Sequence, residues 1–175
     1  MTRTDDIRDD FVALWGRMAS FWGVSPATGR VYGWLIAHDE PQAADDIVEG
    51  LSMSRGAVSM ACRELSDWGL LHQANPAGSR RVYYRAETDL EVAVRRIVET
   101  RKRREWDPVL AQLRQWIPEL KKERAKPSKV FRQRLEDIEG LVALADTMAD
   151  EFLRGGVVQK LGLKLLVARA KAKSG

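Results

Sequence analysis

The sequence predicts a mainly α-helical protein with one small β-hairpin and a helical C-terminal arm. Apolar residues recur every three or four positions through most of the 175 residues, which is the period of an amphipathic helix. Residues 70–74 can form a strand, residues 81–85 are rich in strand-forming residues, and the turn-forming segment 75–79 lies between them. A regular apolar repeat over residues 131–152 is typical of a helix that packs against a partner helix.

Composition narrows the class of protein. Apolar residues make up 45% of the chain and charged residues 31%, which is typical of a globular protein. The N-terminus has no signal-peptide core and no apolar run is long enough to span a bilayer, so we expect a cytoplasmic protein without a membrane partner. One cysteine and two histidines form neither an intrachain disulfide nor a zinc site of the usual spacing, so we expect no metal and no cofactor.

The basic residues are concentrated in the middle of the chain. Residues 71–130 contain 15 Lys and Arg against 8 Asp and Glu, whereas residues 1–70 contain 6 against 11. A concentrated basic segment favours a polyanionic partner such as nucleic acid. The densest run, residues 101–104, fits either contacts to flanking phosphates or a solvated helix face.

Three helices are predicted before residue 52. The second begins at Ser25, a capping residue followed by Pro26 at the first helical position, and runs to about residue 37. The third, residues 42–51, is acidic on one side and apolar on the other. The first covers residues 5–22, and its apolar face is formed by Phe11, Leu14, Trp15, Met18 and Trp22.

A fourth helix leads into the hairpin. Ser54 is placed to cap it, and it ends before Gly69, a residue suited to a left-handed C-terminal cap. We expect Cys62 to be a packed thiol rather than a redox sensor, because it lies on the inward face. That face consists of Val58, Ala61, Cys62 and Leu65.

The remainder of the chain is predicted to be helical. Helices are expected over residues 89–104, 107–120, 128–154 and 157–173, with a charged loop at 121–129 that contains Pro127. The repeat on helix 128–154 needs a partner, so we expect a homodimer. Its interface is predicted to include Phe131, Leu135, Ile138, Val142, Ala145 and Phe152.

The order of helix, short turn, capped helix and basic-tipped hairpin is that of a winged helix-turn-helix domain, whose second helix enters the major groove of DNA. We therefore expect residues 1–88 to bind DNA through helix 54–68 and wing 75–81, and residues 89–175 to mediate dimerisation and possible effector sensing. Arginine side chains donate to guanine edges or phosphates. The candidate DNA-binding residues are Ser54, Arg55, Gly56, Ser59, Met60, Arg63, Ser79, Arg80 and Arg81.

A resemblance to a known family rests on the same residues. The segment SRGAVSM at 54–60, followed by REL at 63–65 and WGL at 68–70, resembles the recognition helix of the GbsR-type branch of MarR-like winged-helix regulators. Residues 33–35 and 83–85 are similar too, although Ala57 stands where a polar residue is usual. The resemblance implies a homodimeric bacterial or archaeal regulator, for which we expect a repressor that reads an inverted-repeat operator. It also suggests a cationic osmolyte such as choline as effector.

The sequence is also compatible with other functions. Trp34, Trp106 and Trp116 are candidates for a cage that binds a cationic effector by cation–π attraction, although core packing accounts for many tryptophans. No phosphate-binding loop, metal cluster or nucleophile–histidine pattern indicates an enzyme. The alternative function is a helical adaptor that binds other proteins through residues 128–173 without specific DNA binding.

Overall fold

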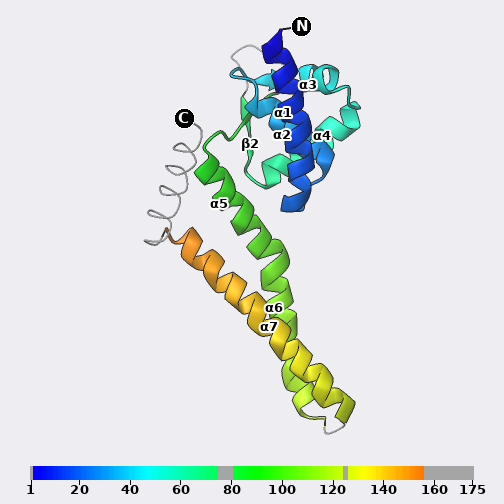
Figure 1. The fold of residues 1–175 in the computed structure, drawn as a ribbon, viewed down its shortest axis with the longest axis vertical. Coiled ribbons are helices and arrows are strands. Elements are labelled where there is room, and N and C mark those ends of the chain that lie inside the picture. The colour runs from blue at the N-terminus through cyan, green and yellow to red at the C-terminus, as the bar shows by residue number, and fades with distance from the viewer. Residues whose placement is uncertain (1, 75–80, 124–125, 156–175) are drawn as a thin grey trace. The chain divides into compact units, whose positions relative to one another are not determined.

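The computed structural model describes residues 2–74, 81–123 and 126–155, and the chain divides into two compact units, residues 1–97 and 98–175 (Figure 1). The predicted class, mainly helical with a small β-structure, is confirmed. The helix expected at 157–173 and the hairpin loop expected at 75–79 lie outside the described residues. In the described part of the chain, no helix is long and apolar enough to cross a lipid bilayer.

The first unit begins with two closely packed helices, α1 (Arg3–Ala19) and α2 (Pro26–Ile36), joined through the short turn η1 (Ser20–Trp22). Ser25 caps α2 as predicted, because its hydroxyl accepts the N–H of Thr28 at 3.0 Å. Glycines on α2 allow a close approach: a Cβ atom at Gly29 would lie 2.3 Å from the Cβ of Ala19.

The apolar face predicted for α1 is only partly right. Its buried residues are Val12, Gly16 and Ala19, and Phe11 and Trp15 are half-buried. The other three members of the predicted face are between 37% and 45% exposed; they are Leu14, Met18 and Trp22. The reason is that the glycines of α2 select small residues at the helix crossing, so the large apolar side chains lie beside it.

A short strand that the sequence pattern did not predict precedes the third helix. Residues 42–51 were expected to be one helix, but Gln42 and Ala43 form strand β1 (Gln42–Ala43) and helix α3 (Ala44–Leu51) begins after them. The carboxylate of Asp46 accepts the N–H of Ala43 at 3.1 Å, which fixes the start of the helix. Strand pairing with a distant segment therefore overrides the local helical pattern.

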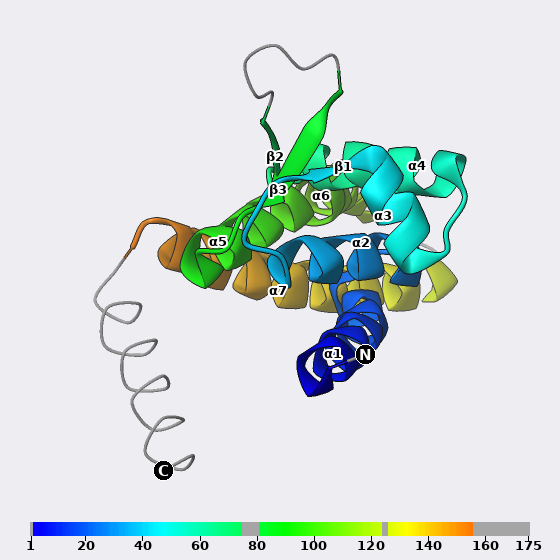
Figure 2. The ribbon, with the colours of Figure 1, turned by 90° about the horizontal axis from the view of Figure 1, so that it is seen from above.

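Helix α4 (Arg55–Asp67) follows α3 after a turn in which Ser52 adopts a left-handed conformation, with φ of 51°. Strands β2 (Leu71–Ala74) and β3 (Tyr83–Ala86) then pair antiparallel, with Leu71 opposite Ala86. β1 adds to the other edge of β3, giving the strand order β1-β3-β2. Figure 2 shows these strands beside α3 and α4. The unit thus has the helix–turn–helix and hairpin order that the sequence predicts.

One apolar core holds the first unit together. Val31, Ile47 and Val58, from α2, α3 and α4, are almost completely buried. Helix α5 (Leu90–Arg101) contributes Ala93 to this core, and Ile97 packs against it. The first turns of α5 therefore pack with the first unit, which ends at Ile97.

The second unit contains a longer continuous helix than expected. The predicted new helix start at Asp107-Pro108 is wrong, because α5 continues through a π-helical turn, η2 (Lys102–Trp106), into α6 (Asp107–Lys121). Pro108 follows this wider turn, at the second position of α6. The helix also continues through Pro118. Likewise, Pro127 does not lie in a loop but in the first turn of α7 (Lys126–Leu153).

Helices α6 and α7 run side by side in opposite directions (Figure 1). Leu113, Ile117 and Leu135 form a small buried cluster between them. At the other end of the pair, the ammonium of Lys102 contacts three carboxylates, those of Asp107 at 3.0 Å, Asp150 at 3.4 Å and Asp146. The carboxylates of Asp146 and Asp107 raise the pKa of Lys102 well above its ordinary value. Lys102 of the basic run 101–104 is therefore committed to contacts within the unit.

Candidate functional site

The candidate site is the exposed face of α4. The helix begins where Ser54 accepts the N–H of Ala57 at 3.2 Å, as the capping pattern predicts. Its inward face, Val58, Ala61, Cys62 and Leu65, is buried as predicted. The opposite face, which we call the reading face, is exposed and consists of Ser54, Arg55, Gly56, Ser59, Met60 and Arg63.

Two residues of the reading face are not explained by the packing of the free protein. Met60 is 75% exposed, although methionine is ordinarily buried. A Cβ atom at Gly56 would meet nothing within 4 Å, so no neighbouring group requires a glycine there. An exposed apolar side chain next to an open glycine suits a surface that another molecule approaches closely.

Arg55 makes an ion pair that the sequence analysis missed. Its Nη1 lies 2.6 Å from the Oδ1 of Asp45, which belongs to the first turn of α3. The acidic side of residues 42–51 was visible in the sequence, but its contact with the reading face depends on how α3 packs on α4. A carboxylate therefore lies beside the basic residue at the start of the reading face.

A buried hydroxyl anchors α4 to the N-terminus of α2. Thr28 is 2% exposed, and its hydroxyl donates to the carboxylate of Glu64 at 2.6 Å. The hydroxyls of Ser25 and Thr28 lie 2.8 Å apart and complete the chain. Glu64, the acidic residue nearest the reading face along the sequence, is therefore oriented toward α2.

Cys62 is an inert thiol in the folded protein. It is 2% exposed on the inward face of α4, and burial raises its pKa to about 11. The reactive thiolate is therefore scarce at neutral pH, which agrees with the packed role predicted from the sequence.

The wing is described only in part. Ser79 and Arg80, both predicted to contact DNA, lie outside the described residues. Arg81 is exposed where the chain re-enters the hairpin. At the base of the hairpin, Arg85 donates to the carbonyl of Asp39 at 2.9 Å and so ties β3 to the loop before β1.

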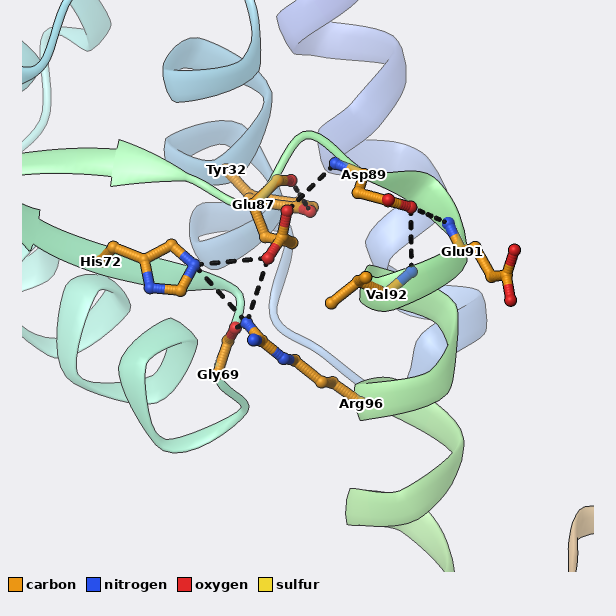
Figure 3. A network of polar contacts seen from close by, with 8 residues as sticks. All are labelled: Tyr32, Gly69, His72, Glu87, Asp89, Glu91, Val92 and Arg96. Atoms are coloured by element: carbon orange, nitrogen blue, oxygen red, sulfur yellow. Dashed lines mark hydrogen bonds and ion pairs between the residues drawn. The ribbon is translucent and has the colours of Figure 1, made fainter. Parts of the chain in front are cut away.

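A polar network joins the base of the wing to the end of α4 and the start of α5 (Figure 3). Arg96, from α5, reaches the carbonyl of Gly69 and lies 3.4 Å from the carboxylate of Glu87. Glu87 also contacts His72 of β2 at 3.4 Å and accepts the N–H of Asp89 at 3.1 Å. The bond from Asp89, together with His72 and Arg96, lowers the pKa of Glu87.

The same network reaches the core through Tyr32. Its hydroxyl donates to the carbonyl of Glu87 at 2.8 Å (Figure 3). Burial and the nearby Glu87 carboxylate raise the pKa of Tyr32 to about 12, so the hydroxyl remains a donor at physiological pH. The base of the wing, the end of α4 and the first turns of α5 are thus joined by hydrogen bonds as well as by the apolar core.

An apolar cavity of about 110 Å³ lies within the first unit. Residues of α1, α2, α4 and α5 line it, among them Trp15, Tyr32, Leu65, Leu90 and Ile97. The lining contains no charged side chain.

The three tryptophans predicted to form an effector cage belong to different units of the chain. Trp34 belongs to the first unit, where its ring centroid lies 4.3 Å from that of His38. Trp106 and Trp116 belong to the second unit, on one continuous helix, and Trp116 is 47% exposed. Trp34 borders a surface hollow of about 150 Å³ together with Asp5 and Asp9.

The predicted dimer residues on α7 divide into two sets. Leu135 is buried within the chain against α6, and Val142, Ala145 and Phe152 are half-buried. Phe131 and Ile138 are about half exposed, at 53% and 48%. They belong to an exposed apolar face of α7 that also includes Val130, Leu141, Leu144 and Met148.

No family model matches the chain, but the chain is similar to known proteins. The chain is 31% identical over 77 residues to the HTH-type transcriptional regulator MmpR5 of Mycobacterium tuberculosis, a match that covers 43% of this chain and 47% of that protein. The chain therefore spans about half the length of this curated relative.

A solved structure described as a transcriptional regulator has the same fold. The two structures align with a TM-score of 0.63 over 83% of this chain and 95% of the other, at 22% identity. The fold is thus a winged helix-turn-helix with long C-terminal helices. Both similar proteins are described as transcriptional regulators, not as enzymes.

Proposed function

We propose that this protein is a sequence-specific DNA-binding transcriptional regulator that inserts α4 into the major groove. The observation that carries the proposal is the reading face of α4, which exposes two arginines, two serines and an open glycine above a fully buried apolar face. The diameter of an α-helix matches the major groove, where arginine donates to guanine and small residues let the backbone approach. The similarity to a regulator of the helix-turn-helix type supports it.

The wing has a separate role in this proposal. Arg81, with Arg80 and Ser79 before it, follows the hairpin loop and would contact phosphates or the minor groove next to the site that α4 reads. Phosphate contacts position a protein on DNA but carry no sequence information, so wing and reading face contribute to affinity in different ways.

We also propose that the protein acts as a homodimer. The exposed apolar face of α7, with Leu141 at 70% and Met148 at 66% exposure, is the kind of surface that a second copy covers. Two-fold symmetry would present two copies of α4 to the half-sites of an inverted repeat. The same face would suit another protein, so the helical adaptor without specific DNA binding is the alternative function.

Finer features of the proposal rest on resemblance alone. They are membership of the GbsR-type branch, action as a repressor, and a cationic osmolyte as effector. Calorimetric titration with choline and with betaine tests the last of these. Trp34→Ala is the matched variant, because Trp34 and the carboxylates of Asp5 and Asp9 border one hollow. Absence of heat at millimolar ligand would exclude both ligands.

The test of DNA binding compares two variants on two duplexes. One duplex is selected on the protein from random DNA, and the other is its scrambled form. Arg55→Ala should lose about 1–3 kcal/mol on the selected duplex and little on the scrambled one, because base contacts are made only at the correct site. Arg80→Ala/Arg81→Ala should weaken binding to both duplexes and reduce the salt dependence by roughly one to two counterions per subunit.

Each outcome has a distinct meaning. Equal losses on both duplexes for Arg55→Ala would show that Arg55 holds phosphate rather than reads bases. An unchanged wing variant would remove the hairpin from the interface. Failure of the wild-type protein to bind any duplex in a salt-dependent manner would refute the regulator and favour the adaptor.

A further inference from the structure

An ion pair joins α3 and α4 at the start of the reading face, and it adds little to the stability of the fold. Arg55 and Asp45 form their 2.6 Å ion pair in solvent, with side chains 79% and 45% exposed. Exposed ion pairs contribute little to the free energy of unfolding, because water screens them and ordering the side chains costs entropy. The pair therefore matters mainly through its effect on the Arg55 side chain.

The pair restricts a long, exposed side chain at the start of the reading face. An unpaired arginine samples many rotamers and must be ordered on binding, whereas a carboxylate contact at Nη1 limits the directions in which the guanidinium points. The guanidinium keeps further N–H donors beyond the one directed at Asp45. A guanine edge, with two acceptors side by side, can engage such donors as a fork.

The carboxylate also changes the charge that DNA meets at this position. Arg55 alone would attract any phosphate, whatever the sequence, and that attraction is the main source of non-specific binding. With Asp45 at 2.6 Å the pair has no net charge, and the carboxylate repels phosphate oxygens. A base edge with neutral acceptors carries no such penalty, so the pair disfavours binding through phosphate alone.

We propose that Asp45 is a specificity-determining residue, which positions Arg55 for a base edge and penalises its use as a phosphate contact. The proposal rests on the DNA-binding function proposed above and extends it to a residue on α3, outside the recognition helix. Asp45 would make no attractive contact with DNA, and its effect would pass through Arg55.

The test measures discrimination rather than affinity alone. Asp45→Asn keeps the size of the side chain and removes its charge, and Glu49→Gln is the control. Glu49 is exposed on the same helix, one turn further on, and none of its contacts among the described residues is an ion pair with Arg55. Dissociation constants are measured on the selected and scrambled duplexes at several salt concentrations, with thermal unfolding to verify that each variant is folded.

Asp45→Asn should bind the scrambled duplex more tightly, with a steeper salt dependence, and the ratio of the two affinities should fall about three- to tenfold. Glu49→Gln should leave the ratio unchanged. In an Arg55→Ala background, Asp45→Asn should no longer change the ratio, because its effect requires the arginine.

The results that overturn the proposal differ from those that overturn the proposed function. An unchanged ratio in Asp45→Asn, equal changes in Asp45→Asn and Glu49→Gln, or a change that persists without Arg55 would each refute the role of Asp45 while leaving the regulator intact. A wild-type protein that does not discriminate between the duplexes would refute the regulator itself, and the role of Asp45 with it.

Discussion

Gly56 is the residue at which the needs of folding and of the proposed function separate most clearly. Glycine is unfavourable within a helix by about 0.5–1 kcal/mol relative to alanine, because it loses more backbone entropy on folding. At Gly56 this cost has no counterpart in packing, since a side chain there would contact nothing within 4 Å. A partner that approaches the backbone of α4 would account for it.

Gly56→Ala should therefore stabilise the protein and weaken DNA binding. We expect the free energy of unfolding to rise by about 0.5–1 kcal/mol in urea titrations. Affinity for the selected duplex should fall, because the new methyl group occupies space at the groove floor. The contrasting variant is Gly29→Ala, whose Cβ would lie 2.3 Å from that of Ala19 and should destabilise the fold. Unaltered affinity in Gly56→Ala would place DNA elsewhere on the helix.

At the scale of single residues, the sequence was sufficient where the local pattern decides. The buried and exposed faces of α4 follow from the 3.6-residue period, and its start follows from the capping chemistry of Ser54. The pair of Arg55 with Asp45 does not follow, because the two residues belong to different helices and their distance depends on packing. A sequence pattern identifies exposed charges without showing which of them meet.

At the scale of elements, the network around Glu87 is the feature with a measurable energetic signature. Its carboxylate joins Arg96 of α5 and His72 of β2, and its pKa lies below the ordinary value of 4.5. A carboxylate with a lowered pKa in the folded state stabilises the fold at pH values above its ordinary pKa. That stabilisation is lost as the pH falls through the folded-state pKa.

Glu87→Gln should therefore be less stable than the wild-type protein at neutral pH, and this difference should shrink in acid. Thermal unfolding of both proteins at about pH 7 and about pH 3 measures it, and other carboxylates cancel in the comparison. The amide still accepts the N–H of Asp89, so the variant isolates the charge. An equal difference at the two pH values would mean that the ionised carboxylate contributes nothing.

The type of the described elements was predicted well, and their junctions poorly. Among the described residues, the helices and the two hairpin strands lie near the predicted ranges, but strand β1 and the continuous helix from α5 into α6 were not predicted. β1 exists because β3 pairs with it across about forty residues of sequence, as in the pair of Gln42 with Tyr84. Pro108 indicated a new helix, yet the helix continues from α5 through the π-helical turn η2 into α6.

At the scale of the whole molecule, the central question is what covers the exposed apolar face of α7. Ile138 lies on this face at 48% exposure, so a charge there should disturb a second copy more than the fold of the chain itself. Ile138→Asp should shift the protein toward monomer in light scattering at micromolar concentration. Thr147→Asp, at an exposed position of the same helix, is the matched control and should not.

Two results would contradict this arrangement. A wild-type protein that is monomeric at micromolar concentration would remove the homodimer. A dimer that survives Ile138→Asp would place its interface elsewhere, and the exposed apolar residues Ile7 of α1 and Phe21 of η1 are the next to test. The sequence predicted an association face on α7 but could not show that Leu135 is used within the chain.

Cys62 makes the opening of α4 measurable by chemical labelling. It is the only cysteine of the chain, and it is buried behind the reading face with a pKa of about 11. A thiol-reactive dye therefore reacts only in molecules whose α4 has detached from the core, so the rate of labelling reports how often the helix opens. No tag or substitution is needed. Bound DNA that holds α4 in place should lower the rate of labelling. The decrease in rate would then report how much of the unaltered protein is bound to DNA.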